Sequence, residues 1–266
     1  MLTIVKRDAY PVAWNEAGGG ELALFLHGLG GSRTSWTPQL TGLAGLRRCV
    51  AWDMPGYGES AGLPGSLEDL ADAAAQLIVD LGETNADIVG LSLGGMIAQH
   101  LAIRHPHRVR SLTLLDTSPA FGLDGTTREH WLNARLDPLR AGANTADIAS
   151  SVIDGIVGPD CPADVRAAAV ESMCRIPTAS LIAACVALVD HDVRDRLSEI
   201  DVPVTVMVGA DDDETPLSYA KLLAAGIPGA RLELIEHCGH LSNVESPERV
   251  NELITQLWAT TDGGHT

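Results

Sequence analysis

The feature that most constrains this chain is a serine flanked by glycines, in the segment GLSLGG at residues 90–95. An apolar, β-prone run precedes this segment, and a helix-like run follows it at residues 96–104. The G-x-S-x-G pattern is typical of a strained turn between a strand and a helix, which projects a serine hydroxyl from the edge of a sheet. Glycines lack Cβ, so the strand and the helix can approach closely around the turn. An incidental serine in a glycine-rich turn is the alternative interpretation, because short motifs recur by chance.

Length, composition and charge limit the class of protein and its partners. The chain has 266 residues, which favours one large domain or one domain with an insertion. A hydrophobic content of 45% and a charged content of 20% are typical of a soluble globular protein that can bury a sizeable core. The net charge is −17 with no run rich in lysine or arginine, which argues against nucleic acid and anionic membrane surfaces as partners. No apolar run approaches the length that spans a membrane.

The cellular location is predicted from the first residues and from the cysteines. Residues 1–8 lack a signal-peptide pattern, because charges come early and no apolar core follows them. The cysteines are odd in number, scattered, and form no C-x-x-C pair: Cys49, Cys161, Cys174, Cys185 and Cys238. We therefore expect reduced thiols and a cytoplasmic protein.

Short apolar runs alternate with amphipathic stretches along the chain. Their near-continuous apolar character predicts a parallel sheet covered on both faces, with strands at residues 22–26, 49–52, 88–91, 109–115, 204–208 and 232–235. An earlier pair, at residues 3–6 and 12–15, could add an antiparallel start. Helices are expected from the cap at Ser66 to about residue 81, and over residues 247–258. The alternation predicts an α/β fold with right-handed crossovers.

This alternation of strands and helices stops between about residues 119 and 200. That stretch has helical character, turn signals and no strong strand pattern. We therefore predict a core domain formed by residues 1–118 and 201–266, with a helical cap inserted at residues 119–200.

A serine nucleophile needs a base, and the base needs a carboxylate to orient it. In folds with this turn, the chain order is serine, acid and histidine. Acidic residues follow the predicted strand at 204–208, and two histidines follow the strand at 232–235. Open α/β sheets place their sites at such strand ends. Gly239 lets the backbone turn sharply before His240, which favours His240 as the base and leaves His237 at the surface. Position alone leaves four candidate acids: Asp211, Asp212, Asp213 and Glu214.

Stabilisation of an oxyanion requires two N–H donors. One is expected from Leu93, the residue after the serine, and the other from an early glycine loop. The loop HGLGG at residues 27–31 follows the first parallel strand, which makes the Leu29 N–H the second donor. A phosphate-binding loop is disfavoured, because no lysine follows and the G-x-G-x-x-G pattern is absent.

Asp53 could bind a metal, but no H-x-H or carboxylate cluster accompanies it, so we expect no metal and no organic cofactor.

Together and in this order, the motifs resemble the α/β-hydrolase superfamily over residues 22–258. The acid motif of that family, D-x-x-T-P three residues after a glycine, matches Gly209 and residues 212–216, so the resemblance selects Asp212. The G-H motif matches Gly239 and His240, and the D-x-x-G-x-G-x-S loop matches residues 53–60. The resemblance implies an α/β-hydrolase fold, a mostly parallel central sheet flanked by helices with a helical cap insertion.

Narrower resemblances concern the substrate. Residues 90–99 and 239–248, and cap stretches at 131–135 and 183–197, are similar to 3-oxoadipate enol-lactonases. This chain has His27 and Pro55 where those enzymes usually have serine and arginine. The loop after residue 52 and the H-G-x-G motif also resemble meta-cleavage-product hydrolases, which break carbon–carbon bonds. Haloalkane dehalogenases are disfavoured, because their nucleophile is an aspartate and this chain has Ser92.

The sequence thus predicts a serine hydrolase that acts on a carboxylic ester or lactone through an acyl-enzyme. Ser92 is the expected nucleophile, His240 the base and Asp212 the orienting acid, with Leu29 and Leu93 as oxyanion donors. Carbon–carbon bond hydrolysis of a meta-cleavage product is the alternative reaction. A ligand receptor that retains the triad is the alternative of another class.

Substrate-binding residues are predicted from position alone. Trp131 lies in the predicted cap and could form a wall of the pocket, although a core or surface aromatic is an equal alternative. His27 belongs to the glycine loop and is a second candidate. The expected partner is a small-molecule ester or lactone, and the oligomeric state cannot be read from the sequence.

Overall fold

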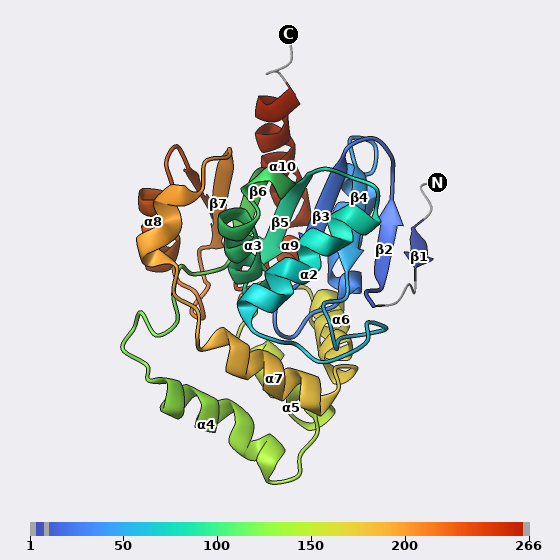
Figure 1. Ribbon diagram of the computed structural model, residues 1–266. Coiled ribbons are helices and arrows are strands. Elements are labelled where there is room, and N and C mark those ends of the chain that lie inside the picture. Colours follow the sequence, from blue (N-terminus) through green and yellow to red (C-terminus); the bar gives the residue numbers. More distant parts are fainter. Residues whose placement is uncertain (1–3, 8–10, 263–266) are drawn as a thin grey trace.

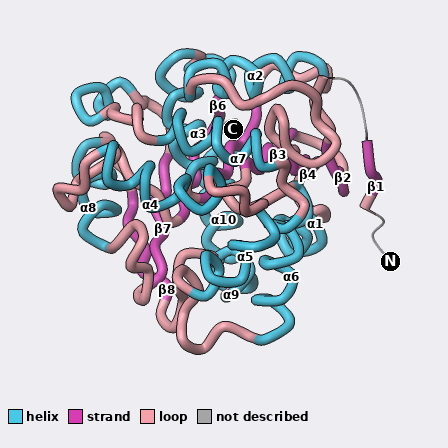
Figure 2. Tube along the Cα trace, turned by 90° about the horizontal axis from the view of Figure 1, so that it is seen from below, coloured by secondary structure: helices cyan, strands magenta, loops and turns pink. Residues whose placement is uncertain are grey.

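A mostly parallel sheet runs through the molecule, which the computed structural model describes at residues 4–7 and 11–262. Within these residues the sheet has eight strands, in the order β1-β2-β4-β3-β5-β6-β7-β8 (Figure 2). Strand β2 pairs antiparallel with both β1 and β4, and the strands from β3 to β8 pair parallel with one another. The bounds are Val5–Arg7, Trp14–Ala17, Leu22–Leu26, Arg48–Trp52, Ala86–Leu91, Val109–Leu115, Val204–Gly209 and Arg231–Ile235 for β1 to β8.

The strand predictions are confirmed with small shifts. β3 and β6 have the predicted bounds, and β4, β5, β7 and β8 are longer by one or two residues. The antiparallel start is also confirmed, but β2 lies two residues later than predicted, because Trp14 pairs with Trp52 of β4 in register. Residue 3 of the predicted first strand lies outside the described residues. The α/β fold class is therefore confirmed.

Successive side chains of the strands enter opposite cores, which explains their continuous apolar character. In β3, Leu22, Leu24 and Leu26 pack in the core beneath α2 (Leu67–Asp80) and α3 (Leu93–Arg104). Ala23 and Phe25 pack in the core beneath α1 (Thr37–Leu43) and α10 (Pro247–Asp262). Figure 1 shows helices in front of the sheet and behind it. Both faces are thus covered, as expected for buried parallel strands.

Local signals set the helix ends. The Ser66 side chain accepts a hydrogen bond from Asp69 N–H at 3.1 Å, and the Asp69 carboxylate accepts from Ser66 N–H at 3.0 Å. This capping box begins α2 where the sequence predicts. α10 runs four residues beyond the predicted end at Trp258, because Arg47 binds the carboxylate of Asp262 at 2.6 Å. The other helices are α8 (Leu217–Gly226), α9 (Ser242–Glu245), η1 (Arg33–Trp36), η2 (Pro106–Arg108) and, before β7, η3 (Arg194–Glu199).

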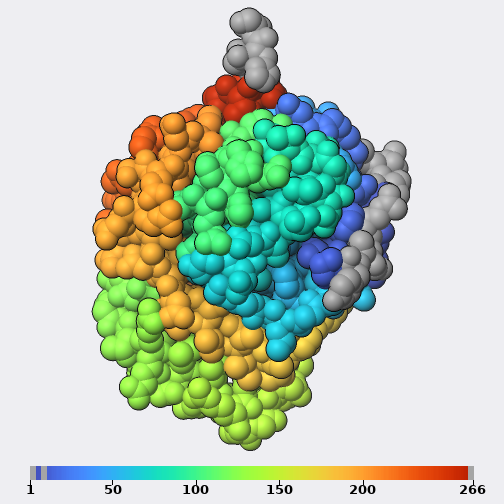
Figure 3. Space-filling view, viewed as in Figure 1, coloured from blue at the N-terminus to red at the C-terminus, as the bar shows by residue number. Residues whose placement is uncertain are grey.

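The chain between β6 and β7 is helical and packs at one end of the sheet. It forms α4 (Arg128–Arg140), α5 (Thr145–Asp154), α6 (Ala163–Cys174) and α7 (Thr178–Leu188), at the bottom of Figures 1 and 3. The predicted domain boundaries stay a prediction. Within residues 4–7 and 11–262, no single helix could cross a membrane by length and apolar character, and α6 with α7 could do so only as a pair bent by 99°.

The turn from β5 into α3 depends on a close backbone contact at Gly90. A Cβ atom at this position would lie 2.4 Å from the carbonyl oxygen of Gly94 and 2.8 Å from the Cα of Gly95. Both contacts are with backbone, so neither can be relieved by a side-chain rotation. Gly90 therefore allows α3 to cross directly over the end of β5.

We expect Gly90→Ala to lower the free energy of unfolding by about 1–3 kcal/mol or more, because the added methyl group overpacks this crossing. Chemical denaturation with circular dichroism measures the change. Gly45→Ala is the matched control, since a Cβ there would meet nothing within 4 Å, and its effect should stay within about 0.5 kcal/mol. Equal stabilities of the two variants would contradict the steric explanation.

Candidate active site

Ser92 lies in the turn between β5 and α3 with a backbone conformation that serine rarely adopts. Its φ is 54° and its ψ is −119°. Such a conformation costs about 1–3 kcal/mol and persists only where the surroundings enforce it. Here the Ser92 N–H donates to the Leu115 carbonyl at 2.9 Å, and the Ser92 carbonyl accepts from the Thr117 hydroxyl at 2.8 Å. A Cβ on Gly94 would lie 2.0 Å from the Leu26 carbonyl, so the turn is closed on that side as well.

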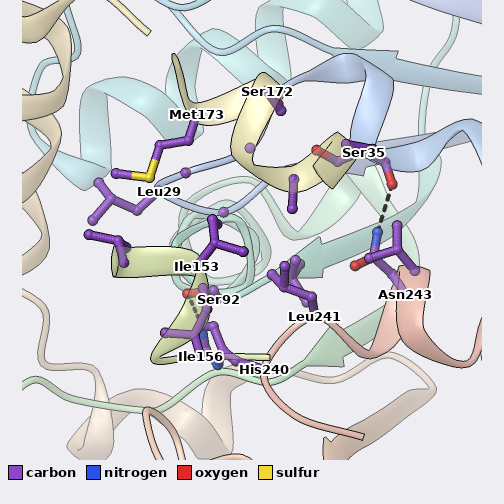
Figure 4. Close-up of a pocket in the computed structure, with 18 of the residues that line it drawn as sticks. Leu29, Ser35, Ser92, Ile153, Ile156, Ser172, Met173, His240, Leu241 and Asn243 are labelled. Atoms are coloured by element: carbon purple, nitrogen blue, oxygen red, sulfur yellow. Dashed lines mark hydrogen bonds between the residues drawn. The ribbon is translucent and has the colours of Figure 1, made fainter. Parts of the chain in front are cut away.

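The structure brings together Ser92, His240 and Asp212, which lie far apart in the sequence. His240 Nε2 is 2.8 Å from Ser92 Oγ, and its Nδ1 is 2.9 Å from Asp212 Oδ2 (Figure 4 shows the first of these contacts). Since the Asp212 carboxylate can only accept, Nδ1–H donates to it, and Nε2 can accept from the Ser92 hydroxyl. His240 and Asp212 are buried, whereas Asp211 and Asp213 are exposed.

The other histidine after β8 is at the surface. The side chain of His237 is 81% exposed, and its φ of 59° turns it away from the buried group. His237 Nδ1 instead lies 3.5 Å from Asp160 Oδ2. The expectation of a surface histidine is met, and His240 remains the candidate base.

The Asp212 carboxylate is held in its ionised form by the hydrogen bonds it accepts. Oδ1 accepts from the N–H groups of Glu214 and Thr215, each at 2.9 Å. Oδ2 accepts from the Thr215 hydroxyl at 2.8 Å as well as from His240. Burial alone would raise the pKa of Asp212, but the His240 charge and these hydrogen bonds outweigh it and lower that pKa. Thr215, which the acid motif contains, thus fixes the carboxylate.

The pKa of the His240 imidazole is shifted in the opposite direction to that of Asp212. Burial alone would lower its pKa, but the Asp212 carboxylate outweighs burial and raises the pKa above its ordinary value of 6.5. The carboxylate of Asp116 adds to this effect. The imidazole is therefore a stronger base than a free histidine side chain, and its cation is stabilised by its neighbours.

Asp116, which the sequence indicates only as the end of a strand, forms hydrogen bonds with Gly209 at the end of β7 and with Ser242 after β8. Oδ1 accepts from Gly209 N–H at 2.9 Å, and Oδ2 accepts from the N–H and hydroxyl of Ser242 at 3.1 and 2.5 Å. Burial, followed by the charge of Asp212, raises the pKa of Asp116 to about 7. Its position directly after the apolar run that forms β6 was the signal available in the sequence.

Glu245 is the second residue that sequence reasoning missed. Its carboxylate accepts from the N–H groups on either side of His240, those of Gly239 and Leu241, each at 3.1 Å. It also accepts from Gly158 N–H at 2.8 Å, and the His240 N–H donates to the Ile156 carbonyl at 2.8 Å. The loop that carries His240 is thus fixed to the segment that follows α5. No short sequence motif marks this contact, because it joins residues 87 positions apart.

The predicted oxyanion donors lie on either side of Ser92. Leu93 begins α3, where the first N–H groups lack acceptors within the helix and the helix dipole is positive. Leu29 lies in the loop after β3, and the Tyr57 hydroxyl donates to its carbonyl at 3.0 Å, which fixes that peptide. Within the described part of the chain, neither N–H has a hydrogen-bond acceptor. Both groups are therefore free to bind a ligand oxygen.

The structure does not place His27 in the wall of the cavity, which corrects the prediction of a substrate contact. The side chain is fully buried, and Met54 N–H donates to its Nε2 at 3.0 Å. Nδ1 therefore carries the proton and donates to the Gly28 carbonyl at 2.9 Å. Burial lowers the pKa of His27, which keeps the imidazole neutral. His27 thus supports the glycine loop from behind.

A cavity of about 700 Å³ opens in front of Ser92 and His240. Figure 4 shows apolar side chains from the glycine loop, α5, α6 and the loop after β8 around it, beside the polar side chains of Ser35, Ser172 and Asn243. Trp131 of α4 is part of its wall and packs edge-to-face on Phe121, with ring centroids 5.6 Å apart. The contact of Trp131 with a substrate stays a prediction.

Asp53 and the other acidic or histidine side chains form no metal cluster within the described residues. Asp53 Oδ1 accepts from Arg33 N–H at 2.9 Å, and its Oδ2 lies 3.3 Å from Arg33 Nε. Oδ2 also accepts from Glu59 N–H at 3.2 Å. Asp53 therefore fixes the loop after β4.

The sequence matches the model of a known family. A family model described as the Alpha/beta hydrolase family matches residues 23–253. The chain therefore belongs to the alpha/beta hydrolase family. The predicted α/β-hydrolase fold and the resemblance to this superfamily are confirmed.

Named relatives narrow the class of activity. A pimeloyl-acyl-carrier-protein methyl ester esterase of Aromatoleum aromaticum is 34% identical over 255 residues, 88% of this chain and 96% of that protein. A 3-oxoadipate enol-lactonase 1 of Acinetobacter baylyi is 27% identical over 259 residues, 96% of this chain and 95% of that protein. The structure of a thermophilic esterase from Thermogutta terrifontis has a TM-score of 0.85 at 27% identity, covering 97% of this chain and 99% of that one. These relatives are hydrolases, and they support hydrolysis of esters.

The electrostatics of the site generate a titration prediction. We expect His240 to titrate above pH 6.5, with the neutral imidazole populated only as the pH rises through the raised pKa. In Asp212→Asn the carboxylate charge is lost, so the pKa should fall by about 1–3 pH units. Histidine NMR across pH 4–10 measures both values. Asp213→Asn, at the exposed neighbour, should leave the titration unchanged, and an equal shift in both variants would contradict the assigned pairing.

The Glu245 contacts generate a stability prediction. Glu245→Ala should lower the free energy of unfolding by about 1–3 kcal/mol, because backbone N–H groups around His240 lose their acceptor. Chemical denaturation measures this loss, and the His240 NMR signals should also shift. Glu248→Ala, at an exposed glutamate three residues later, should change stability by less than about 0.5 kcal/mol. Similar losses of unfolding free energy in both variants would rule out a specific contribution from the Glu245 hydrogen bonds.

Proposed function

We propose that this protein is a serine hydrolase of a carboxylic ester or lactone, acting through Ser92, His240 and Asp212. The observation that carries the proposal is the continuous hydrogen-bonded series of these side chains, at 2.8 and 2.9 Å, opening into an apolar cavity. A nucleophile, a base and an orienting carboxylate in contact are the arrangement that acyl transfer requires. The esterase and lactonase relatives support the same class of reaction.

The first half of the proposed reaction forms an acyl-enzyme. Ser92 Oγ attacks the carbonyl carbon while His240 Nε2 takes the hydroxyl proton. The carbonyl oxygen becomes an oxyanion, which accepts from the N–H groups of Leu29 and Leu93. Loss of one such donor typically raises the barrier by about 3–4 kcal/mol. The carbon–oxygen bond to the leaving group then breaks, and the His240 proton moves to the departing alkoxide.

The second half releases the acid. Water gives a proton to His240 Nε2 as its oxygen attacks the acyl carbon, and the oxyanion again binds Leu29 and Leu93 N–H. Collapse breaks the bond to Ser92 Oγ, which recovers its proton from His240. Asp212 stays ionised throughout and stabilises each imidazolium, since its pKa is lowered. With a lactone, the leaving alkoxide becomes a hydroxyl that stays attached to the acyl chain throughout, so deacylation releases a single hydroxy acid.

We also propose that residues 119–200 act as a cap and that the protein works in the cytoplasm. Helices α5 and α6 contribute Ile153 and Met173 to the cavity wall, so the substrate would lie between these helices and the sheet. All cysteines are free, and burial raises the pKa of Cys49, Cys185 and Cys238 to about 12. Free thiols, of which Cys174 is exposed, favour a reducing compartment.

We expect Ser92→Ala to lower kcat/KM for short p-nitrophenyl esters by at least about 10³-fold, because the nucleophile is lost. Ser198→Ala, at an exposed serine, should retain the rate. A fluorophosphonate probe should label the Ser198→Ala protein but not the Ser92→Ala protein. Unchanged turnover in Ser92→Ala would refute the mechanism. Labelling without repeated turnover would favour a ligand receptor, and preference for a vinylogous diketo acid would favour carbon–carbon bond hydrolysis.

A further inference from the structure

The cavity is built for a substrate with a large apolar portion. Its wall is dominated by aliphatic side chains, among them Leu29, Ile153, Ile156, Met173, Leu188 and Leu241. Its volume of about 700 Å³ lies within the range of ligand pockets, about 300–1,000 Å³. Burial of each additional methylene group in such a wall favours binding.

The arginines that line the cavity already have carboxylate partners. Arg135 Nη2 lies 2.8 and 2.9 Å from the two carboxylate oxygens of Glu214, and its guanidinium is 5.2 Å from the centre of the Trp131 ring. Arg175 Nη1 lies 2.9 Å from Glu171 Oε1. Within the described wall, carboxylates therefore compete for the cations that an anionic substrate would need. Asp164 adds another carboxylate to this wall.

A second pocket beside Ser92 is also lined by acidic residues. A smaller pocket of about 210 Å³ shares Ser92, Trp131, Arg135 and Glu214 with the main cavity. The carboxylates of Asp124, Asp213 and Glu214 and the Tyr219 hydroxyl belong to its wall. An anionic group reaching from the reacting carbonyl into either space would meet carboxylates.

We propose that the site selects uncharged esters or lactones with an extended apolar chain and excludes substrates that carry a second, free carboxylate. This inference rests on the proposed function and names the substrate class of the same site. A carboxylate entering the cavity would lose its hydration without gaining a free cation, and the lining carboxylates would repel it. A methyl group in the same place would lose nothing and would bury apolar surface. The Arg135–Glu214 pair is the specificity-determining element, because it neutralises the arginine closest to both pockets.

A matched substrate pair tests this inference. p-Nitrophenyl hexanoate and mono-p-nitrophenyl adipate have the same leaving group and six-carbon acyl chains, and they differ only in a terminal methyl or carboxylate. We expect kcat/KM to be at least 10-fold higher for the hexanoate. Along neutral esters from acetate to octanoate, kcat/KM should rise by up to about fourfold per methylene group. Equal rates for the two matched esters, or preference for the adipate, would overturn the inference.

A variant tests the role of the ion pair. Glu214→Gln removes the carboxylate that occupies Arg135, so the ratio of adipate to hexanoate turnover should rise at least fivefold. Glu199→Gln is the control, because it breaks the exposed pair with Arg196 away from the cavity, and its ratio should match the parent protein. An unchanged ratio in Glu214→Gln would exclude the Arg135–Glu214 pair as the determinant. Thermal unfolding of each variant confirms that the compared proteins are folded.

Failure of the proposed function gives a different result. If neither matched ester is hydrolysed and a fluorophosphonate leaves Ser92 unlabelled, the serine mechanism itself is wrong, and the inference falls with it. If Ser92 is labelled and the adipate is the better substrate, the mechanism stands and only the charge selection is wrong.

Discussion

The convergence of parallel strand ends at one edge of the sheet is the constraint on which the rest of the site depends. The loops after β3, β5, β6, β7 and β8 supply, in that order, Leu29, Ser92, Asp116, Asp212 and His240. Each residue follows its strand within a few positions, so the register of the sheet fixes their spacing before any side chain makes a contact. The strained backbone at Ser92 is then held between neighbouring strands, and the hydrogen bonds of His240 complete the arrangement.

The two carboxyl groups near His240, those of Asp212 and Asp116, lie in different environments. Asp212 accepts several hydrogen bonds and has a lowered pKa, whereas burial and the charge of Asp212 raise the pKa of Asp116. Of two neighbouring carboxylates, one is thus maintained as the anion that faces the imidazole. The other works mainly as a hydrogen-bond acceptor for Gly209 and Ser242. Separation of pKa values between neighbouring acids is a common way to give each a distinct role.

The features of the fold that depend on local sequence patterns could be predicted from the sequence. Buried parallel strands are apolar along their whole length, so the bounds of β3 and β6 followed from composition, and Ser66 marked the start of α2. Gly209 to Pro216 brought Asp212, rather than its neighbours, against His240, as the family motif indicated. His27 was misassigned because its environment depends on Met54 N–H, which lies in the loop after β4. The contact of Glu245 with Gly158 was missed because it joins residues 87 positions apart, and such contacts leave no local pattern.

The Glu245 carboxylate joins Gly158, from the helical segment after β6, to the N–H groups of the residues before and after His240. This contact bears on how the family could diversify. An inserted helical segment is easily imagined as an exchangeable module that changes the substrate while the sheet retains the chemistry. Here the module also supports the loop of the base, since the Ile156 carbonyl accepts from His240 N–H. A chimera with a foreign insertion would therefore have to keep residues 156–158, or an equivalent backbone, to keep the histidine loop in place.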